Sequence, residues 1–146
     1  MRVVRLCTRK HAGLDGEGAR LLGGRWNSPG RAAVYTASCG ALAALEYMVH
    51  LTRLPANMLL LRIEVPDTLE RETIDSLPAD PKVFRQLGDE WLHANKTAVL
   101  IVPSVLVPRQ WNLIINPAHP LSAAIKIVEQ VPFAFDSRLL SAVPFP

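Results

Sequence analysis

A pair of glycines precedes an arginine in the segment Gly23-Gly24-Arg25-Trp26-Asn27. Glycines let a backbone approach a ligand closely because they carry no side chain. An arginine beside them can bind a phosphate or a carboxylate through paired N–H donors. The segment therefore predicts an anion-binding loop. The alternative is that Arg25 stacks on Trp26 or pairs with a surface carboxylate.

A second candidate, Glu46, lies in the apolar run from Cys39 to Leu51. A carboxylate at the wall of a cleft could orient a sugar hydroxyl or stabilise a developing positive charge. The spacing also places Glu46, His50 and Arg53 on one helical face, so a solvated helix surface is the competing interpretation.

Three further polar residues follow or end apolar segments. Tyr35 ends a short buried strand, where a tyrosine is usually a core residue with a satisfied hydroxyl. Ser104 follows Pro103 after an apolar run, and Asn116 opens the proline-restricted loop Asn116–Pro120. Turn formation explains both equally well. The four histidines have no metal-ligand spacing, so we predict no metal site.

Hydrophobic periodicity predicts the elements that must position these residues. Two helices are expected, over residues 39–51, with Ser38 as the N-cap, and from Asp80-Pro81 to about 96, with an interruption at Gly88. The segment 11–30 is expected to be a long ordered loop, because it holds six of the eight glycines. Strands are expected over residues 2–6, 32–36, 58–65, 98–102, 113–115 and 125–131, and Phe133 and Phe135 are expected to fill the core. This order favours an α+β fold over a βαβ series.

The composition is that of one globular domain spanning residues 1–146, with a loose tail at about 140–146. Of its residues, 49% are hydrophobic and 20% charged, and the net charge is only +3. The arginines are scattered, whereas nucleic-acid binders concentrate basic residues in a patch. Cys7 and Cys39 form no CxxC motif and are expected to be reduced thiols. Apolar runs end well before the ~18 residues of a membrane span, so we expect a cytoplasmic protein.

Several segments together resemble the RES domain, the toxin half of Xre-RES toxin–antitoxin pairs. The resemblance covers roughly residues 3–139. It rests on GGRWNSPGRAAVYTA, LAALEYMVHL, GDEWL, VPSVLVP, NLIINPAHP and PFAFDSRL, in this order. The family is named for an arginine, a glutamate and a serine. These match Arg25, Glu46 and Ser104.

The resemblance implies a fold like that of ADP-ribosyltransferases, with a split, mostly antiparallel β core, flanking helices and NAD⁺ in a cleft. It implies that Glu46, Tyr35, Arg25 and Ser104 are catalytic. Arg25, Trp26, Asn27, Tyr35 and Asn116 would contact NAD⁺, which is the substrate, and no metal is required. The implied partner is an Xre-type DNA-binding antitoxin that covers the cleft, and self-association within such a complex stays open.

The implied activity is NAD⁺ depletion by hydrolysis or phosphorolysis of the nicotinamide–ribose bond. Two alternatives stay open at this point. One is a mono-ADP-ribosyltransferase that modifies a specific protein. The other is a small basic binding module without enzymatic activity, which the sequence pI of about 9.2 would suit.

Overall fold

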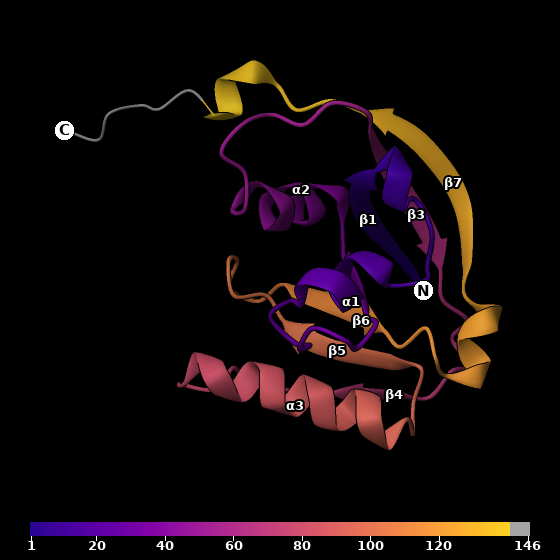
Figure 1. The fold of residues 1–146 in the computed structure, drawn as a ribbon. Coiled ribbons are helices and arrows are strands. Elements are labelled where there is room, and N and C mark those ends of the chain that lie inside the picture. Colours follow the sequence, from indigo (N-terminus) through magenta and orange to yellow (C-terminus); the bar gives the residue numbers. More distant parts are fainter. Residues whose placement is uncertain (141–146) are drawn as a thin grey trace.

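Seven strands form one sheet in the order β4-β5-β6-β2-β1-β3-β7 (Figure 1). The computed structural model describes residues 1–140. All strand pairings are antiparallel except the parallel pair β4 and β5. The strands are β1 (Arg2–Thr8), β2 (Val34–Ala37), β3 (Met58–Glu64), β4 (Arg71–Thr73), β5 (Val99–Pro103), β6 (Trp111–Ile115) and β7 (Lys126–Phe133). The expected α+β class with a mostly antiparallel sheet is confirmed.

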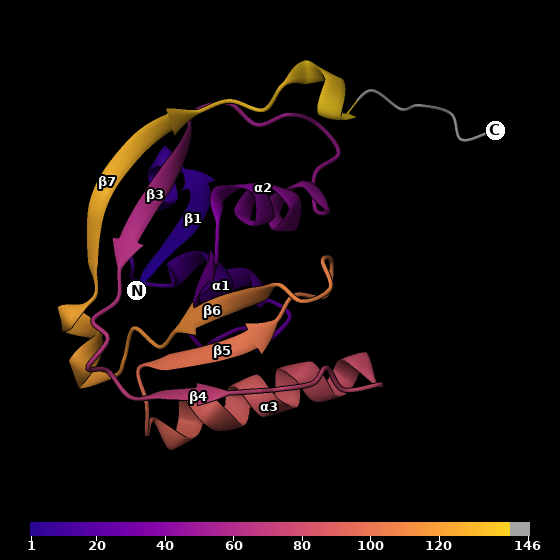
Figure 2. The same cartoon turned by 180° about the vertical axis from the view of Figure 1, so that it is seen from behind.

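The sheet is split between β1 and β2. These strands are joined through the single register pair Val4 and Ala37, whereas β1 pairs with β3 along its whole length. The two halves of the sheet therefore diverge, with β1, β3 and β7 in one half and β2, β6, β5 and β4 in the other (Figures 1 and 2).

Three α-helices accompany the sheet: α1 (Glu17–Leu22), α2 (Gly40–Met48) and α3 (Pro81–Ala94). Phe84 and Trp91 of α3 pack with residues of β5 and β6. Leu42 and Ala43 of α2 pack with Leu6 of β1 and with Ala37 of β2. Successive residues of a strand point to opposite faces, so residues two apart share a face. Ala37 pairs with Asn112, which lies two residues before Ile114, and Ile114 packs with Phe84 and Trp91 of α3. Both helices therefore cover the same face of the sheet.

The opposite face carries a third apolar cluster, formed by alternate residues of the central strands. Val3, Leu61 and Ile63 are wholly buried there. Arg5 lies on the same side and its Nη1 donates to the carbonyl of Gly13 at 2.6 Å, which fastens the loop after β1 to the sheet. Burial lowers the pKa of the Arg5 guanidinium.

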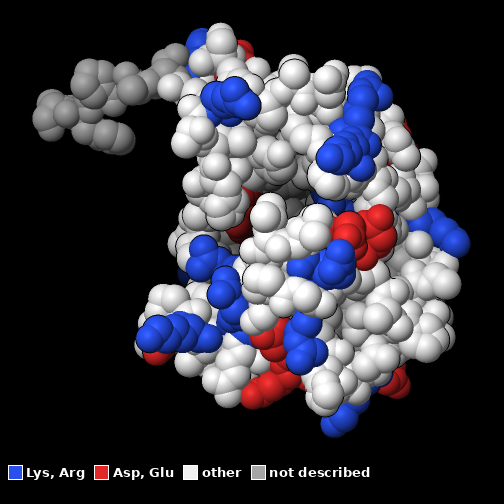
Figure 3. Space-filling view, in the orientation of Figure 1, with Lys and Arg blue, Asp and Glu red and all other residues white. Residues whose placement is uncertain are grey.

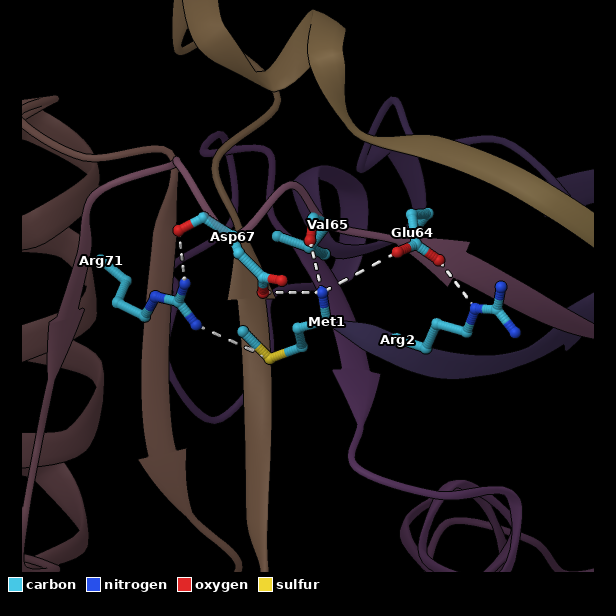
Figure 4. A network of polar contacts seen from close by, with 6 residues as sticks. All are labelled: Met1, Arg2, Glu64, Val65, Asp67 and Arg71. Atoms are coloured by element: carbon cyan, nitrogen blue, oxygen red, sulfur yellow. Dashed lines mark hydrogen bonds and ion pairs between the residues drawn. The ribbon is translucent and has the colours of Figure 1, made fainter.

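Three short 3₁₀ turns lie outside the strands: η1 (Arg9–His11) after β1, η2 (Pro120–Ala124) between β6 and β7, and η3 (Ser137–Leu140) after β7. A polar network holds the start of β1 against the segment after β3 (Figure 4). The amine of Met1 donates to the carbonyl of Val65 at 2.8 Å and to Oδ1 of Asp67 at 2.9 Å. Arg2 pairs with Glu64 at 2.8 Å. The network therefore holds the first residues of β1 in place at the end where β1 begins to pair with β3.

Several sequence expectations were wrong in detail. The glycine-rich segment is not free of regular structure, because α1 lies within it between Gly16 and Gly23, both at positive φ. Cys39 rather than Ser38 is the N-cap of α2. The helix α3 passes through Gly88 without interruption. The short strand β4 was not predicted. The tail predicted at about residues 140–146 lies, beyond Leu140, outside the described residues.

Other expectations were right. Oδ1 of Asp80 accepts from the backbone N–H of Lys82, so Asp80 caps α3 as predicted, with Pro81 in the first turn. Phe135 is buried and makes an edge contact with Phe133, with ring centroids 5.0 Å apart. Cys7 and Cys39 are both free thiols.

Candidate functional site

The backbone turn that carries Arg25 is held from below by Tyr35 of β2. The Tyr35 hydroxyl accepts from the backbone N–H of Trp26 at 3.0 Å and donates to Oδ1 of Asn27 at 2.6 Å. A Cβ atom at Gly24 would lie 2.5 Å from the same hydroxyl oxygen, so only glycine fits there. Burial raises the pKa of Tyr35 and keeps the hydroxyl protonated as a donor.

Trp26 and Asn27 follow Arg25 in the chain, and both are buried. Nδ2 of Asn27 donates to the carbonyls of Ala19, Ser28 and Arg31 at 2.8 to 3.2 Å, and the residue has no exposed surface. Trp26 lies against Phe84, with ring centroids 5.1 Å apart. The sequence predicted both as NAD⁺ contacts. The structure places both side chains inside the protein, where they fix the shape of the turn.

The exposed guanidinium of Arg25 lies over the ring of Phe84, 5.6 Å from its centroid. Such an arrangement holds a cation weakly and leaves its N–H donors available. Among the described residues, Arg25 forms no ion pair. Within residues 1–140, Arg25 therefore pairs with no surface carboxylate. It does stack on an aromatic ring, but the ring is that of Phe84 and not of Trp26.

One side of α3 supports the whole turn. Asp89 accepts from the backbone N–H of Ser28 at 2.8 Å and from its hydroxyl at 2.5 Å. Arg85 donates to the carbonyl of Gly24 at 3.4 Å. Gly88 lies directly against the backbone of Trp26, where a side chain would overlap it. These residues share one helical face with Phe84, so one face of α3 positions Arg25. The helix lies about sixty residues after Arg25 in the sequence.

Glu46 is held by two donors from other elements. Its Oε1 accepts from Oγ of Ser104 at 2.9 Å and from Nδ2 of Asn112 at 2.7 Å. The hydroxyl of Ser104 also accepts from the backbone N–H groups of Leu106 and Val107, each at 3.1 Å. The solvated-face interpretation of Glu46 is therefore wrong, because the carboxylate is tied to the sheet. The helix ends at Met48, before His50 and Arg53.

The Arg25 turn and the Glu46 carboxylate lie on the same face of the sheet. Tyr35 pairs with Ile114 and Ala37 pairs with Asn112, so the side chains of Tyr35 and Asn112 are diagonal neighbours. Such neighbours are roughly 7 Å apart. The Arg25 charge also acts on the Tyr35 hydroxyl. In Figure 3 this side of the molecule has a hollow between α2 and α1, with an acidic side chain inside and basic side chains around it.

Asn116 does not join this group. It follows the last residue of β6, at the opposite end from Asn112. Its Nδ2 donates to Oδ1 of Asn95 at 2.8 Å, and its Oδ1 accepts from the backbone N–H of Ala118 at 3.1 Å. The buried Asn116 therefore ties the Asn116–Pro120 loop to the end of α3, and its polar atoms are used within the protein.

Sequence reasoning missed Asn112. The available signal was an asparagine in the otherwise apolar strand β6, WNLII, opposite the strand that carries Tyr35. Within residues 1–140, no group of three or more histidine, cysteine, aspartate or glutamate side chains could hold a metal ion. Over the same residues, no helix has the length and apolarity needed to cross a bilayer.

Comparisons with known proteins agree with these motifs. The family described as "RES domain" matches residues 2–136. A "Prs ADP-ribosylating toxin" of Sphingobium sp. strain YBL2 is 45% identical over 139 residues, which cover 87% of this chain and 86% of that protein. A "Toxin Res" of Pseudomonas putida is 39% identical over 138 residues, covering 88% of this chain and 94% of the relative.

A solved structure shares the fold. It is a chain of the M. tuberculosis MbcT-MbcA toxin-antitoxin complex, with a TM-score of 0.71 and 19% identity, over 91% of this chain and 84% of that one. The split α+β sheet expected from the resemblance is thus the fold observed. With a family match over almost the full described length and relatives near 40% identity, the chain belongs to the RES domain family.

Proposed function

We propose that this chain is the toxin of a toxin–antitoxin pair and that it cleaves the bond between nicotinamide and ribose in NAD⁺. The observation that carries the proposal is the placement of Glu46. One of its oxygens is held by Ser104 and Asn112, and the other is bound by no described residue. The name of one relative, "Prs ADP-ribosylating toxin", supports an enzyme that acts on NAD⁺, and the name "Toxin Res" supports a toxin.

The chemistry requires charge stabilisation more than acid catalysis. When the bond between the ribose carbon and nicotinamide breaks, the electron pair stays on the nicotinamide nitrogen and neutral nicotinamide leaves. The ribose carbon carries positive charge until a nucleophile adds, as in glycoside cleavage. In this proposal the free oxygen of Glu46 accepts from a ribose hydroxyl and stabilises that charge. Ser104 acts by holding the carboxylate.

Arg25 binds the pyrophosphate in this proposal. Its guanidinium is exposed, unpaired within the described residues and anchored over Phe84, as a phosphate ligand should be. Tyr35 lies between Arg25 and Glu46, but its hydroxyl already makes two hydrogen bonds within the protein. Its contribution is therefore to fix the Arg25 turn and to offer its ring to the nicotinamide ribose. Trp26 and Asn27 contribute to NAD⁺ binding through the turn. Asn116, which is distant along β6, contributes only to the scaffold.

The nucleophile that takes ADP-ribose defines the final activity. Water gives ADP-ribose with release of a proton, and phosphate gives ADP-ribose 1″-phosphate. A protein side chain gives a mono-ADP-ribosylated protein. Protein mono-ADP-ribosylation is the second candidate function, and the 45% identity to a "Prs ADP-ribosylating toxin" favours it. All three share the cleavage step at Glu46.

We also propose that an antitoxin of the Xre type covers, in the cytoplasm, the face of the sheet that carries Glu46. A free NAD⁺-consuming enzyme would be harmful to its own cell. The fold is shared with a chain of a toxin–antitoxin complex, which supports a protein partner for this chain.

Nicotinamide release tests the proposal. The purified chain is incubated with NAD⁺, with and without phosphate and with a cell extract, and products are separated by chromatography. We expect nicotinamide release, with the co-product naming the nucleophile. Glu46→Gln should lower turnover at least ~100-fold. Glu90→Gln is the matched control, because Glu90 lies on α3 and accepts only from Gln86 in the described structure. Equal turnover by the folded Glu46→Gln variant would refute the role of Glu46.

A further inference from the structure

Asn112 contacts Glu46 from β6, and neither composition nor motif singled it out. Its Nδ2 lies 2.7 Å from Oε1 of Glu46, slightly closer than the Ser104 hydroxyl at 2.9 Å. Both groups donate to the same oxygen. A carboxylate can accept at both oxygens, so two donors on one of them leave the other without a protein partner.

The other oxygen, Oε2, has no hydrogen-bond partner among the described residues and is not fully buried. Among the described residues, Oδ1 of Asn112 is the side-chain atom that is both buried and without a hydrogen-bond partner. Oε2 of Glu46 also has no partner, but it is not buried. Since no described residue donates to Oε2, this oxygen is reached by water. The two oxygens of Glu46 therefore differ, one fixed inside the protein and one available to a ligand.

The amide of Asn112 can take only one orientation. Turning it over would place Oδ1 against a carboxylate oxygen, and two acceptors repel each other. The observed orientation leaves Oδ1 buried and unpartnered, which is unfavourable for folding. An apolar side chain in the strand would avoid this cost. Asn112 therefore serves as a donor to Glu46 at a cost to the stability of β6.

We propose that Asn112 is a positioning residue that fixes which oxygen of Glu46 meets the substrate. This inference rests on the proposed role of Glu46. Asn112 holds Oε1, together with Ser104, and so leaves Oε2 to meet the substrate. Ser104 alone leaves the carboxylate free to rotate about its last bond, because a single hydroxyl hydrogen does not define the carboxylate plane. The second donor, from a different strand, does define it.

Steady-state kinetics with NAD⁺ test this role. Asn112→Ala should lower kcat about 10- to 100-fold, the range expected for one hydrogen bond to a charged group, with a smaller effect on KM. In a Glu46→Gln background, the same change should cost less than about twofold, because the two residues act as one unit. Equal costs in both backgrounds would mean that Asn112 acts independently of Glu46, which overturns the proposal.

Two variants separate positioning from folding. Asn112→Asp keeps the shape but replaces the donor with an acceptor, so it should lose at least as much kcat as Asn112→Ala. The matched control is Thr36→Val. Thr36 lies on β2, its side chain points to the opposite face of the sheet from Asn112, and its buried hydroxyl donates to the carbonyl of Leu113. It should lower the unfolding midpoint and keep kcat. An Asn112→Asp variant that is folded and fully active would contradict the inference.

An NMR measurement keeps the inference testable without turnover. The side-chain amide resonance of Asn112, assigned by its loss in Asn112→Asp, should shift in Glu46→Gln and stay in place in Glu90→Gln. No shift in Glu46→Gln would overturn the proposal, whether or not the wild-type chain releases nicotinamide. Absence of release with a shifted resonance would refute the proposed function and leave the pairing of Asn112 with Glu46 standing.

Discussion

Gly88 of α3 lies so close to Trp26 that a Cβ atom at residue 88 would overlap the Trp26 carbonyl oxygen. The glycine looked like an interruption of a helix in the sequence, yet the helix is continuous. Its function is to let the Arg25 turn lie directly on the helix backbone. Ser28 and Gly24 are then within reach of Asp89 and Arg85.

Gly88→Ala should therefore displace the Arg25 turn. Because the added methyl group meets backbone rather than a flexible side chain, the free energy of unfolding should fall by about 1–3 kcal/mol or more. Urea denaturation measures this. The matched control is Gly18→Ala in α1, where nothing lies within 4 Å of the added Cβ. That variant should be neutral or stabilising by up to about 1 kcal/mol. A Gly88→Ala variant as stable as the wild type would contradict the close approach.

Tyr35→Phe should weaken NAD⁺ binding through the turn. The change leaves the buried N–H of Trp26 and Oδ1 of Asn27 without the Tyr35 hydroxyl, which costs about 1–3 kcal/mol of stability. We expect a lower unfolding midpoint together with a raised KM. Tyr47→Phe is the control, because Tyr47 lies on α2 and packs against Phe135. If Tyr35→Phe left both quantities unchanged, the hydroxyl would not hold the turn.

Alkaline pH should destabilise the protein through Tyr35. Burial raises the pKa of this phenol above its usual value near 10, so the folded state keeps a proton that the unfolded state loses. The contribution of Tyr35 to stability is therefore complete below about pH 10 and falls as the pH rises toward the folded-state pKa, by up to about 1.4 kcal/mol per pH unit. Urea midpoints between pH 8 and pH 11 measure the slope. The slope should be smaller in Tyr35→Phe, and an identical slope in that variant would assign the loss to other groups.

Arg25→Ala should raise the KM for NAD⁺ more than it lowers kcat. A hydrogen-bonded guanidinium–phosphate contact contributes about 1.5–3 kcal/mol, so KM should rise roughly 10- to 100-fold. Arg25→Lys should recover part of the affinity, because lysine keeps the charge without the paired donors. Arg62→Ala is the control, since Arg62 pairs with Glu129 on exposed strand surface. An unchanged KM in Arg25→Ala would remove Arg25 from the anion site.

The sequence predicted the main elements because their signals are local. Apolar periodicity located β3, α2 and α3, and Asp80-Pro81 marked the start of α3. The candidates Glu46, Arg25 and Ser104 were named from motifs of the family resemblance. What the sequence could not provide were relationships between distant segments. The donor from Asn112 to Glu46 spans 66 residues, and the contact of Gly88 with Trp26 depends on the docking of a helix on a turn.

The same limit explains the residues whose side chains lie inside the protein. Asn27, Trp26 and Asn116 stand in motifs beside the site, but a motif does not reveal which side chains face inward. Asn27 is buried and donates to carbonyl groups of α1 and of its own loop, and the buried Asn116 donates to Asn95 at the end of α3. The segment of α1 was missed because its glycines lie at its two ends, where a positive φ is required, as well as inside it.

The support of Glu46 also sets the order of events during synthesis of the chain. Its two donors come from residues 104 and 112 of a chain of 146 residues. A ribosome that has made α2 and the Arg25 turn has not yet made the strand that aims the carboxylate. The proposed activity is therefore absent from the nascent polypeptide until β6 has emerged and paired with β2.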